Sequence, residues 1–414
     1  MSINKRIVLA YAALATALPS TSFASDSLEQ ALNDGDFYGD IRYRYEFVDQ
    51  TGFANDANAS TIRTRLGYNS GTFYDFSFGV EVEDISRVFS DNNNDTTNNK
   101  TTYPVVADPD SNHVNQLFIK YAGIPDTELK VGRQVIALGN HRFVGHVGWR
   151  QNNQTFDAGK ITNTSIPDTK ITYAFIDRVN RIFGEHSSNG KWDSDSHIIN
   201  IVNNSLAALG TITGYGYFLD FNRDAPAASN RTYGINLKGA QKLSDDWKFK
   251  YYAEYATQSD HGSNTTNYDA DYYHLAPAIA YKGITATIGY EVLGSDNGVI
   301  GFATPLATLH KFNGVTDKFL TTPVTGLEDK YIELKYKTAG LTGDWNCFND
   351  ILLKAQYHDF QSEQGSTDFG SEWHVYVKKT FNKKYFVEAK YADWDADTVS
   401  SDTQKFVLGI GIKL

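Results

Sequence analysis

The sequence has little of what many protein functions require. Its 414 residues include a single cysteine, Cys347, and one methionine, at the first position. One cysteine excludes an internal disulfide and any metal site built from several cysteines. No run of about 18 apolar residues occurs, which excludes a membrane-spanning helix. The net charge of -11 at pH 7 argues against nucleic acid as a partner, because proteins that bind nucleic acid usually carry an excess of basic residues.

Sequence motifs for catalysis and metal binding are also missing. The ten histidines show no His-Glu-x-x-His spacing, and no Gly-x-Ser-x-Gly motif occurs. The segment from Asp91 to Asp95 begins like a calcium loop. However, Thr96 stands where such a loop needs glycine, and Thr102 stands where it needs a bidentate glutamate. We therefore expect no cofactor, no metal and no enzyme activity. A loose cation site in the segment 88–112 stays open.

The first residues have the composition of a secretory signal. Lys5 and Arg6 precede an apolar core of 12 residues, 7–18, which is too short to span a membrane as a helix. Small residues at Ser22 and Ala24 suit signal peptidase. We expect residues 1–24 to be removed and the mature chain to start near residue 25.

Aromatic residues are plentiful, with 26 Tyr and 25 Phe, although mean hydropathy is only -0.42. Alternation along the chain explains both values. In the last nine residues, Phe406 and Ile410 belong to an apolar parity, whereas Gly409 and Lys413 belong to a parity of mostly small or charged residues. A strand with two such faces suits lipid on one side and water on the other.

The same alternation recurs along the mature chain. Most of the segments reach the roughly 9–11 residues that a tilted strand needs to cross a bilayer. We predict an all-β fold: a single-domain transmembrane antiparallel β-barrel of about 18 strands over residues 25–414. A large secreted β protein fits the composition equally well, but rarely sustains this pattern over so many segments. The predicted strands are 36–48, 60–69, 73–87, 113–122, 127–135, 154–162, 170–181, 196–204, 210–221, 231–241, 247–258, 271–281, 284–293, 330–337, 350–360, 371–381, 384–394 and 404–414.

Connections between these strands differ in length. Short turns on the periplasmic side and long loops outside are typical of such barrels, and an even strand number places both termini on the periplasmic side. Pro277 is unfavourable inside the strand 271–281 because it lacks an N–H group. The long segments are 88–112, 136–153, 182–195 and 294–329.

Charged residues of the strands concentrate on the parity that faces the lumen. This placement avoids a cost of about 2–4 kcal/mol for Arg or Lys at the middle of the lipid face. Four arginines on two neighbouring strands should form a ladder on one wall. The ladder either lines an anion-attracting constriction or is satisfied by nearby carboxylates. The four arginines are Arg42, Arg44, Arg63 and Arg65, and the carboxylates are Glu46, Glu81 and Glu83.

Two long loops carry unusual sequences. The first runs from Gly132-Arg133-Gln134 through Arg142-Phe143-Val144-Gly145 and Trp149-Arg150-Gln151 to Phe156-Asp157. It is rich in Arg, Gln and aromatic residues, so it can fold inward and narrow the lumen. The second carries Pro305-Leu306-Ala307-Thr308-Leu309-His310 and continues to Gly326-Leu327. Over nearly the whole mature chain, the sequence resembles the alginate-export family of outer-membrane porins.

This resemblance implies an 18-stranded monomeric barrel with a basic, anion-attracting pore. By the same resemblance, Arg42, Arg63, Arg133, Arg142 and Arg150 match the pore arginines, and Asp157 is their expected partner. Together with the ladder, the predicted pore-lining set is Arg42, Arg44, Arg63, Arg65, Lys130, Arg133, Arg142, Arg150, Asp157, Glu46 and Glu81.

The function expected from these features is passive diffusion of small hydrophilic, anionic solutes through a water-filled channel in the outer membrane of a Gram-negative bacterium. The partners are then membrane lipid and the solutes, and a monomer is favoured over a trimer. A dedicated export channel for an anionic polysaccharide such as alginate is the main alternative. A barrel enzyme and a passive structural barrel are alternatives from other classes, and a non-conducting barrel would favour the last.

Overall fold

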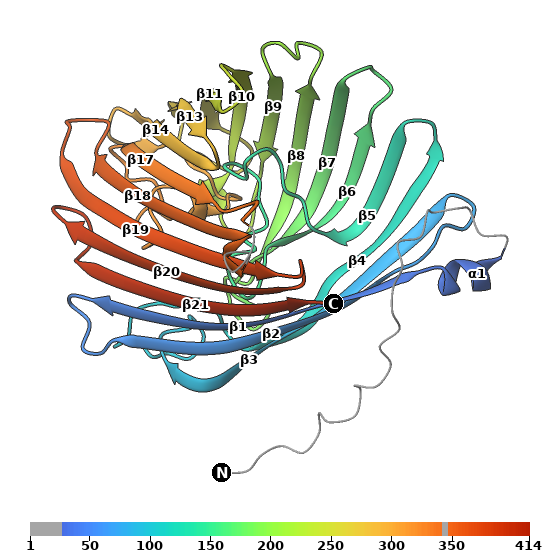
Figure 1. Ribbon diagram of the computed structural model, residues 1–414, viewed down its shortest axis with the longest axis horizontal. Coiled ribbons are helices and arrows are strands. Elements are labelled where there is room, and N and C mark those ends of the chain that lie inside the picture. The colour runs from blue at the N-terminus through green and yellow to red at the C-terminus, as the bar shows by residue number, and fades with distance from the viewer. Residues whose placement is uncertain (1–26, 342–346) are drawn as a thin grey trace.

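The computed structural model describes residues 27–341 and 347–414. The predicted signal peptide lies outside these residues, so its cleavage stays a prediction. Figure 1 shows one curved sheet that wraps around an interior space, with the short helix α1 (Leu28–Asn33) beside it. Among the described residues, no helix is long and apolar enough to cross a membrane.

The sheet closes on itself through its first and last strands. Residues of β1 pair antiparallel with residues of β21, for example Tyr43 with Ile410. Apart from β12 and β13, described below, each further barrel strand pairs antiparallel with the barrel strands before and after it. The barrel strands are β1 (Asp36–Gln50), β2 (Ala57–Asn69), β3 (Phe76–Asn92), β4 (Ser111–Ile124), β5 (Thr127–Gln134), β6 (Thr155–Asn163), β7 (Thr169–Asn180), β8 (Lys191–Asn203), β9 (Thr211–Leu219), β10 (Asn230–Lys242), β11 (Trp247–Asp260), β12 (Asp269–Leu275), β13 (Ala278–Tyr281), β14 (Ile284–Leu293), β17 (Leu327–Lys337), β18 (Ile351–Gln361), β19 (Asp368–Phe381), β20 (Tyr385–Ala396) and β21 (Thr403–Lys413).

One barrel position is shared by two short strands. Both β12 and β13 pair with β11 on one side and with β14 on the other. The interruption includes Pro277, whose carbonyl oxygen still accepts a hydrogen bond from the backbone N–H of Ile288 at 3.1 Å. Counting this pair once, the described residues form a closed barrel of 18 antiparallel strands. The predicted fold and strand number are therefore confirmed.

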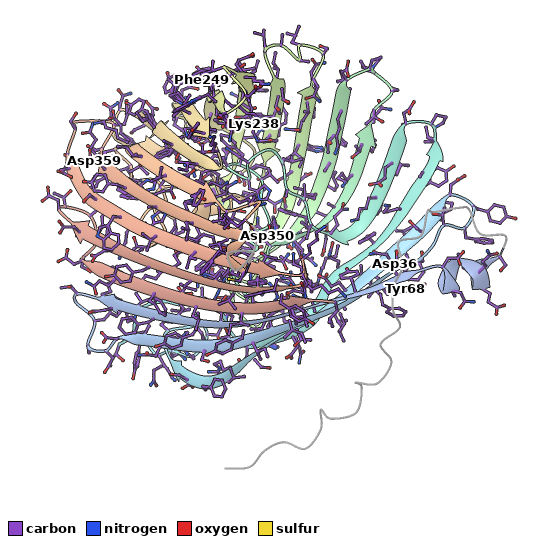
Figure 2. The ribbon with its side chains drawn as sticks, in the orientation of Figure 1. Asp36, Tyr68, Lys238, Phe249, Asp350 and Asp359 are labelled. Atoms are coloured by element: carbon purple, nitrogen blue, oxygen red, sulfur yellow. The ribbon has the colours of Figure 1, made fainter. Side chains whose placement is uncertain are left out.

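The two faces of the sheet differ as the alternation requires. Large apolar side chains are exposed on the outer face, among them Val131 at 63% and Ile288 at 67%. Inward-facing neighbours on the same strands are polar or charged, such as Lys130 and Glu291. Figure 2 shows side chains projecting on both sides of the sheet. An apolar outer band around a polar interior is the arrangement of a barrel that stands in lipid.

Two of the long loops fold into the barrel. One joins β5 to β6 over residues 135–154, and Figure 1 shows the segment after β5 running through the interior. The other joins β14 to β17 over residues 294–326 and includes β15 (Ser295–Asp296), β16 (Ile300–Gly301) and the 3-10 turn η2 (Leu309–Lys311). A further turn, η1 (Pro226–Ala228), precedes β10. The sequence allowed the first loop to fold inward without deciding it, and the contacts described below place this loop inside the lumen.

We predict that Ile288→Arg lowers the free energy of unfolding in lipid vesicles by about 2–4 kcal/mol, because it places a charge on the lipid face. Thr287→Arg is the matched control. Thr287 faces inward opposite Glu333, so the new guanidinium would meet water and a carboxylate. Equal losses for the two variants, measured by reversible urea unfolding, would contradict the assigned faces.

Candidate functional site

Loop 135–154 crosses the lumen from one wall to the opposite one. Its residues from Gly148 to Asn153 lie against β1 and β2. Its residues Arg142 to Val144 lie against β9, β12 and β14, which are on the far side of the closed sheet. An irregular segment in this position must find partners for its backbone polar groups, since water has limited access to it. The arginine ladder supplies many of those partners.

Arg42 and Arg63 lie directly opposite each other on β1 and β2. The Arg42 guanidinium donates to Oε1 of Gln151 at 2.9 Å, to the carbonyl oxygen of Gly148 at 3.0 Å and to the carbonyl oxygen of Arg150. Arg63 donates to the carbonyl oxygen of Gln151 at 3.4 Å and forms an ion pair with Asp40. Hydrogen bonds from charged groups contribute about 1.5–3 kcal/mol each. The ladder therefore holds the loop in place.

The other two ladder arginines bind the same loop. Arg44 donates to the carbonyl oxygen of Trp149, and its guanidinium lies 4.1 Å from the centre of the Trp149 ring. Arg65 donates to Oδ1 of Asn153 and forms an ion pair with Glu83. As residues, Arg42, Arg44 and Arg63 are 7%, 2% and 4% exposed, so little of this charge meets the lumen directly.

Gln151 lies at the centre of the attachment and is fully buried. Its side-chain amide donates to Oγ1 of Thr61 at 3.0 Å, while its backbone N–H donates to Asp108 at 2.7 Å. Asp108 comes from the loop between β3 and β4, so three segments meet here. Burial disfavours the charged form of Asp108, but Arg150, Arg44 and the Gln151 N–H outweigh it and lower the pKa of this carboxyl.

Arg150 joins the crossing loop to three carboxylates. Its guanidinium lies 3.1 Å from Glu46, 3.7 Å from Asp108 and 3.5 Å from Asp317. Although burial opposes the charged form, these carboxylates raise the pKa of Arg150. Asp317 belongs to loop 294–326, so this arginine also connects the two inward loops.

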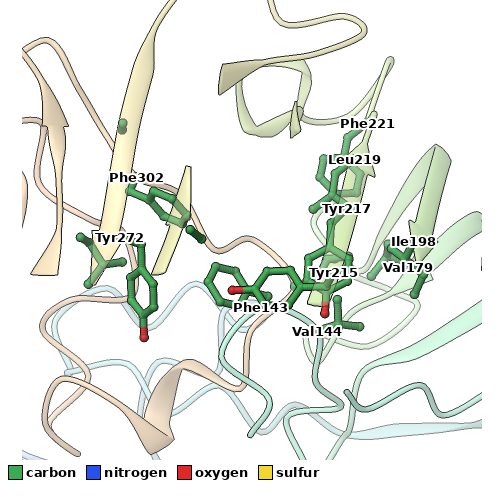
Figure 3. Close-up of a cluster of buried hydrophobic side chains, with 14 of the residues drawn as sticks. Phe143, Val144, Val179, Ile198, Tyr215, Tyr217, Leu219, Phe221, Tyr272 and Phe302 are labelled. Atoms are coloured by element: carbon green, nitrogen blue, oxygen red, sulfur yellow. The ribbon is translucent and has the colours of Figure 1, made fainter. Parts of the chain in front are cut away.

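At the far wall, the crossing loop is held by a buried ion pair and an aromatic cluster. Arg142 is 1% exposed and lies 2.9 Å from Glu291 of β14. Figure 3 shows Phe143 packed among aromatic side chains, with its ring centre 5.2 Å from that of Tyr215 and 5.3 Å from that of Tyr272 on the wall, and 5.9 Å from that of Phe302 in loop 294–326. Burial of large rings is among the strongest contributions to packing, so this end of the loop is fixed by apolar area.

Loop 294–326 has its own anchors on the wall. The Glu372 carboxylate on β19 accepts hydrogen bonds from the backbone N–H groups of Val315 at 2.6 Å and Thr316 at 3.0 Å. The amide of Asn313 donates to Glu291 at 2.7 Å and to Asp329 at 3.1 Å. Carboxylates on the wall therefore hold this loop by its N–H groups, whereas arginines hold the other loop by its carbonyl oxygens.

The two loops also bind each other. Val144 and Leu306 form a parallel β-bridge, and the backbone N–H of Gly145 donates to the carbonyl oxygen of Leu306 at 2.8 Å. The side-chain amide of Gln154 donates to the carbonyl oxygens of Gly145 at 2.8 Å and Leu306 at 3.2 Å. The loops thus form one unit that narrows the lumen.

A stacked pair of rings lies where the two loops meet. The Trp149 and His310 rings are parallel within 2°, with centres 3.5 Å apart. His310 Nδ1 lies 2.6 Å from Asp317, and Lys390 Nζ lies 2.6 Å from His310 Nε2. Burial lowers the pKa of His310 well below its usual value, and Lys390 opposes protonation further. A neutral imidazole fits both contacts, with Nδ1–H donating to Asp317 and Nε2 accepting from Lys390.

A family model for alginate export matches residues 34–290, more than half of the chain. The chain belongs to the alginate-export family. The expected resemblance is confirmed over the matched residues. No protein of curated function matches the sequence.

Solved structures resemble this member of the family in fold. OpdK from Pseudomonas aeruginosa matches with a TM-score of 0.70 and 15% identity, over 92% of this chain and 99% of that chain. OccAB2 from Acinetobacter baumannii matches with a TM-score of 0.72 and 15% identity, over 93% of this chain and 98% of that chain. At this identity the likeness shows the barrel fold alone.

Arg133 and Asp157 do not line the pore of this family member. They form an ion pair at 2.8 Å, but Arg133 pairs in register with Leu117, which is 54% exposed on the outer face. Asp157 is opposite Arg133, and Arg178 continues the same outward row. The expectation that this pair lines the pore is wrong, because strand parity directs both side chains outward.

The remaining candidates face inward. Lys130 lies 3.4 Å over the Phe118 ring, in register with Lys120 and Lys160. Glu81 accepts a hydrogen bond from Asn115, and its carboxylate is 4.0 Å from Arg65. The ladder is thus satisfied partly by carboxylates and partly by the crossing loop.

The sequence analysis did not identify several residues that hold the two inward loops. Gln151, Asp108, Asp317, Asp329 and Glu372 hold the loops, yet they were not among the predicted site residues. Parity would have placed Glu372 inward, on the same face of its strand as Lys378. The pairing of these side chains with particular loop atoms had no signal in the sequence.

Asp91, at the end of β3, and Asp95, in the connection to β4, make contacts within the segment 88–112. Asp91 forms an ion pair with Lys100 at 3.0 Å, and Asp95 accepts hydrogen bonds from the N–H groups of Thr97 and Asn98 at 2.7 and 2.9 Å. Within residues 27–341 and 347–414, no group of three His, Cys, Asp or Glu side chains is placed to hold a metal ion.

We predict that Arg42→Gln combined with Arg44→Gln loosens the crossing loop and raises single-channel conductance, since several charge-assisted hydrogen bonds of about 1.5–3 kcal/mol each are lost. Arg133→Gln is the matched control and should leave conductance unchanged, because Arg133 lies on the outer face. A conductance change from Arg133→Gln, or none from the double variant, would contradict the assigned positions.

The attachment of loop 294–326 should weaken in acid. The pKa values of His310 and Asp317 are both lowered in the folded protein, so each contributes stability that is complete above its unfolded pKa and is lost as the pH falls towards its folded pKa. For His310 the loss begins near its ordinary pKa of 6.5. We expect limited proteolysis of this loop to accelerate between pH 7.5 and 5, and His310→Gln to reduce that acceleration. A rate that does not depend on pH in the wild type would contradict this assignment.

Proposed function

We propose that the protein is an outer-membrane porin that lets small hydrophilic anions diffuse through a water-filled channel narrowed by the two inward loops. Solutes would move down their own gradient, with no covalent step. The outer membrane of a Gram-negative bacterium, reached through a cleaved signal peptide, is the proposed location. The barrel closes within one chain, so a channel needs no second chain, and we further propose a monomer as the working unit.

The observation that carries this proposal is the charge left on the inner wall once the loops are anchored. Towards the short-turn end of the barrel, inward-facing lysines stay accessible to water: Lys238, Lys248, Lys250 and Lys335. In contrast, the wall carboxylates Glu291, Asp329 and Glu372 are buried against loop groups. A chain with a net charge of -11 therefore keeps a basic lumen.

Lysines also face one another in register on two parts of the wall. Lys120, Lys130 and Lys160 follow one another across β4, β5 and β6, and Lys335 lies opposite Lys354. Glu128 and Glu333 are paired with members of these rows, Lys120 at 3.1 Å and Lys354 at 3.3 Å. These rows supply more positive than negative charge to a passing solute.

Export of an anionic polysaccharide is the second candidate, and membership in the alginate-export family favours it. A polymer with a carboxylate on every unit needs a continuous series of free cations along its path. Here Arg42, Arg44 and Arg63 are buried and used to hold the crossing loop. This use of the ladder favours small solutes over a polymer.

We predict that the wild-type channel in a planar bilayer passes chloride more readily than potassium. Changing Lys238, Lys250 and Lys335 together to Gln should shift the reversal potential in a salt gradient towards that of a non-selective pore, since it removes water-accessible positive charge. Lys383→Gln, in a short turn between β19 and β20, is the control and should have no effect. A wild-type reversal potential near zero or cation-selective would contradict the proposal.

Oligomers of mannuronate separate the two candidates in the same recordings. The small-solute porin predicts brief or no interruption of the current, since the loop unit obstructs a polymer. Long-lived, concentration-dependent block that depends on the lumen lysines would favour the exporter.

A further inference from the structure

A cavity of about 580 Å³ lies at the long-loop end of the barrel, where the two inward loops meet. Several loops at this end of the barrel line the cavity, including the loops that carry Phe53, Val105 and Phe183. The stacked rings of Trp149 and His310 also line it. A volume in this range suits a small organic molecule.

Large apolar side chains are exposed around this cavity. Phe53 is 38% exposed, Val105 is 48% exposed and Leu320 is 51% exposed. These residues belong to loops that line the cavity, so membrane lipid does not account for them. Clustered exposed apolar side chains in a concave site are typical of a surface that binds an apolar group.

Two cations in the same wall have no ion-pair partner within the part of the chain that the structure describes. Lys318 donates to Oγ1 of Thr403 at 2.6 Å, whereas its neighbour Asp317 is held by Lys405 at 2.7 Å and by His310. Burial, with the nearby Lys405 charge, lowers the pKa of Lys318 to about 8. A partly buried ammonium with a hydroxyl as its protein partner is poised to accept a carboxylate.

The second cation is Arg181. Its guanidinium lies 3.8 Å over the Trp192 ring and 4.7 Å over the Phe183 ring, and it donates to the carbonyl oxygen of Asn189 at 3.2 Å. Burial lowers its pKa to about 10. The ring contacts hold the guanidinium in place without neutralising it, so its remaining N–H donors can serve a ligand.

We propose that this cavity is a binding site for small organic anions that combine one carboxylate with a ring-sized apolar body. The carboxylate pairs with Lys318 or Arg181, and the body lies against apolar side chains such as Phe53 and Leu320. The inference rests on the proposed function in one respect: the ligand would be a solute that the channel passes. It adds selection by shape and apolar area to selection by charge.

The test compares three probes on the full-length protein folded in detergent, by isothermal titration calorimetry. Phenylacetate carries both features, acetate lacks the ring, and 2-phenylethanol lacks the charge. We expect phenylacetate to bind more tightly than either of the others. Lys318→Gln or Arg181→Gln, whichever removes the cation that pairs with the carboxylate, should weaken phenylacetate binding roughly tenfold, equivalent to about 1.4 kcal/mol.

Matched controls lie outside the cavity. Lys383→Gln and Arg223→Gln each remove one positive charge outside the cavity. Lys383 lies in a short turn, and the Arg223 side chain is 77% exposed, so both variants should leave phenylacetate binding unchanged. Heat-dependent mobility in gels reports whether each variant is folded, and the two cavity variants are independent of each other. Equal binding of phenylacetate and acetate would overturn the inference, as would unchanged binding in both folded cavity variants.

Failure of this inference is distinguishable from failure of the porin proposal. An anion-preferring current without selective phenylacetate binding contradicts the cavity site alone. Selective phenylacetate binding in a barrel without anion preference contradicts the proposed function alone.

Discussion

The structure depends on the hydrogen bonds between the guanidinium groups of β1 and β2 and the loop that crosses the lumen. Arginines on the inner wall need acceptors, and an irregular segment inside a barrel needs donors for its carbonyl oxygens. Arg42 and its neighbours meet both needs at once, because their donors match the oxygens of Gly148, Arg150 and Gln151. An unanchored segment at this depth would leave buried polar groups without partners on both sides.

Because the loops are anchored in this way, the arginines and carboxylates that hold them occupy different parts of the inner wall. One wall holds loop 135–154 by its carbonyl oxygens through arginines, and another holds loop 294–326 by its N–H groups through Glu372 and its neighbours. Most of the acid on the inner wall is used in this way or in pairs with arginine. Lysines nearer the short-turn end stay accessible to water, so an acidic chain can still present a basic path. The same loops create the cavity at the opposite end.

Alternation predicted the barrel well, because lipid imposes a two-residue period on every strand; even the interruption at Pro277 was visible. Parity also placed Arg42 and Glu46 inward. Strand parity, if applied up to the end of β5, also predicts that Arg133 faces outward. The resemblance to the family instead led to its assignment to the pore. Contacts between the wall and the loops, such as Glu372 with Val315, join residues far apart in the chain, and no local pattern encodes them.

The most direct test of the account is a disulfide between the two inward loops. Val144 and Leu306 are bridge partners, and both are buried, so Val144→Cys with Leu306→Cys in a Cys347→Ser background should crosslink on mild oxidation. We expect an efficient crosslink within one chain and a single-channel conductance equal to that of the wild type. A folded barrel that fails to crosslink, or whose conductance changes when the bond forms, would contradict a constriction built from the two joined loops.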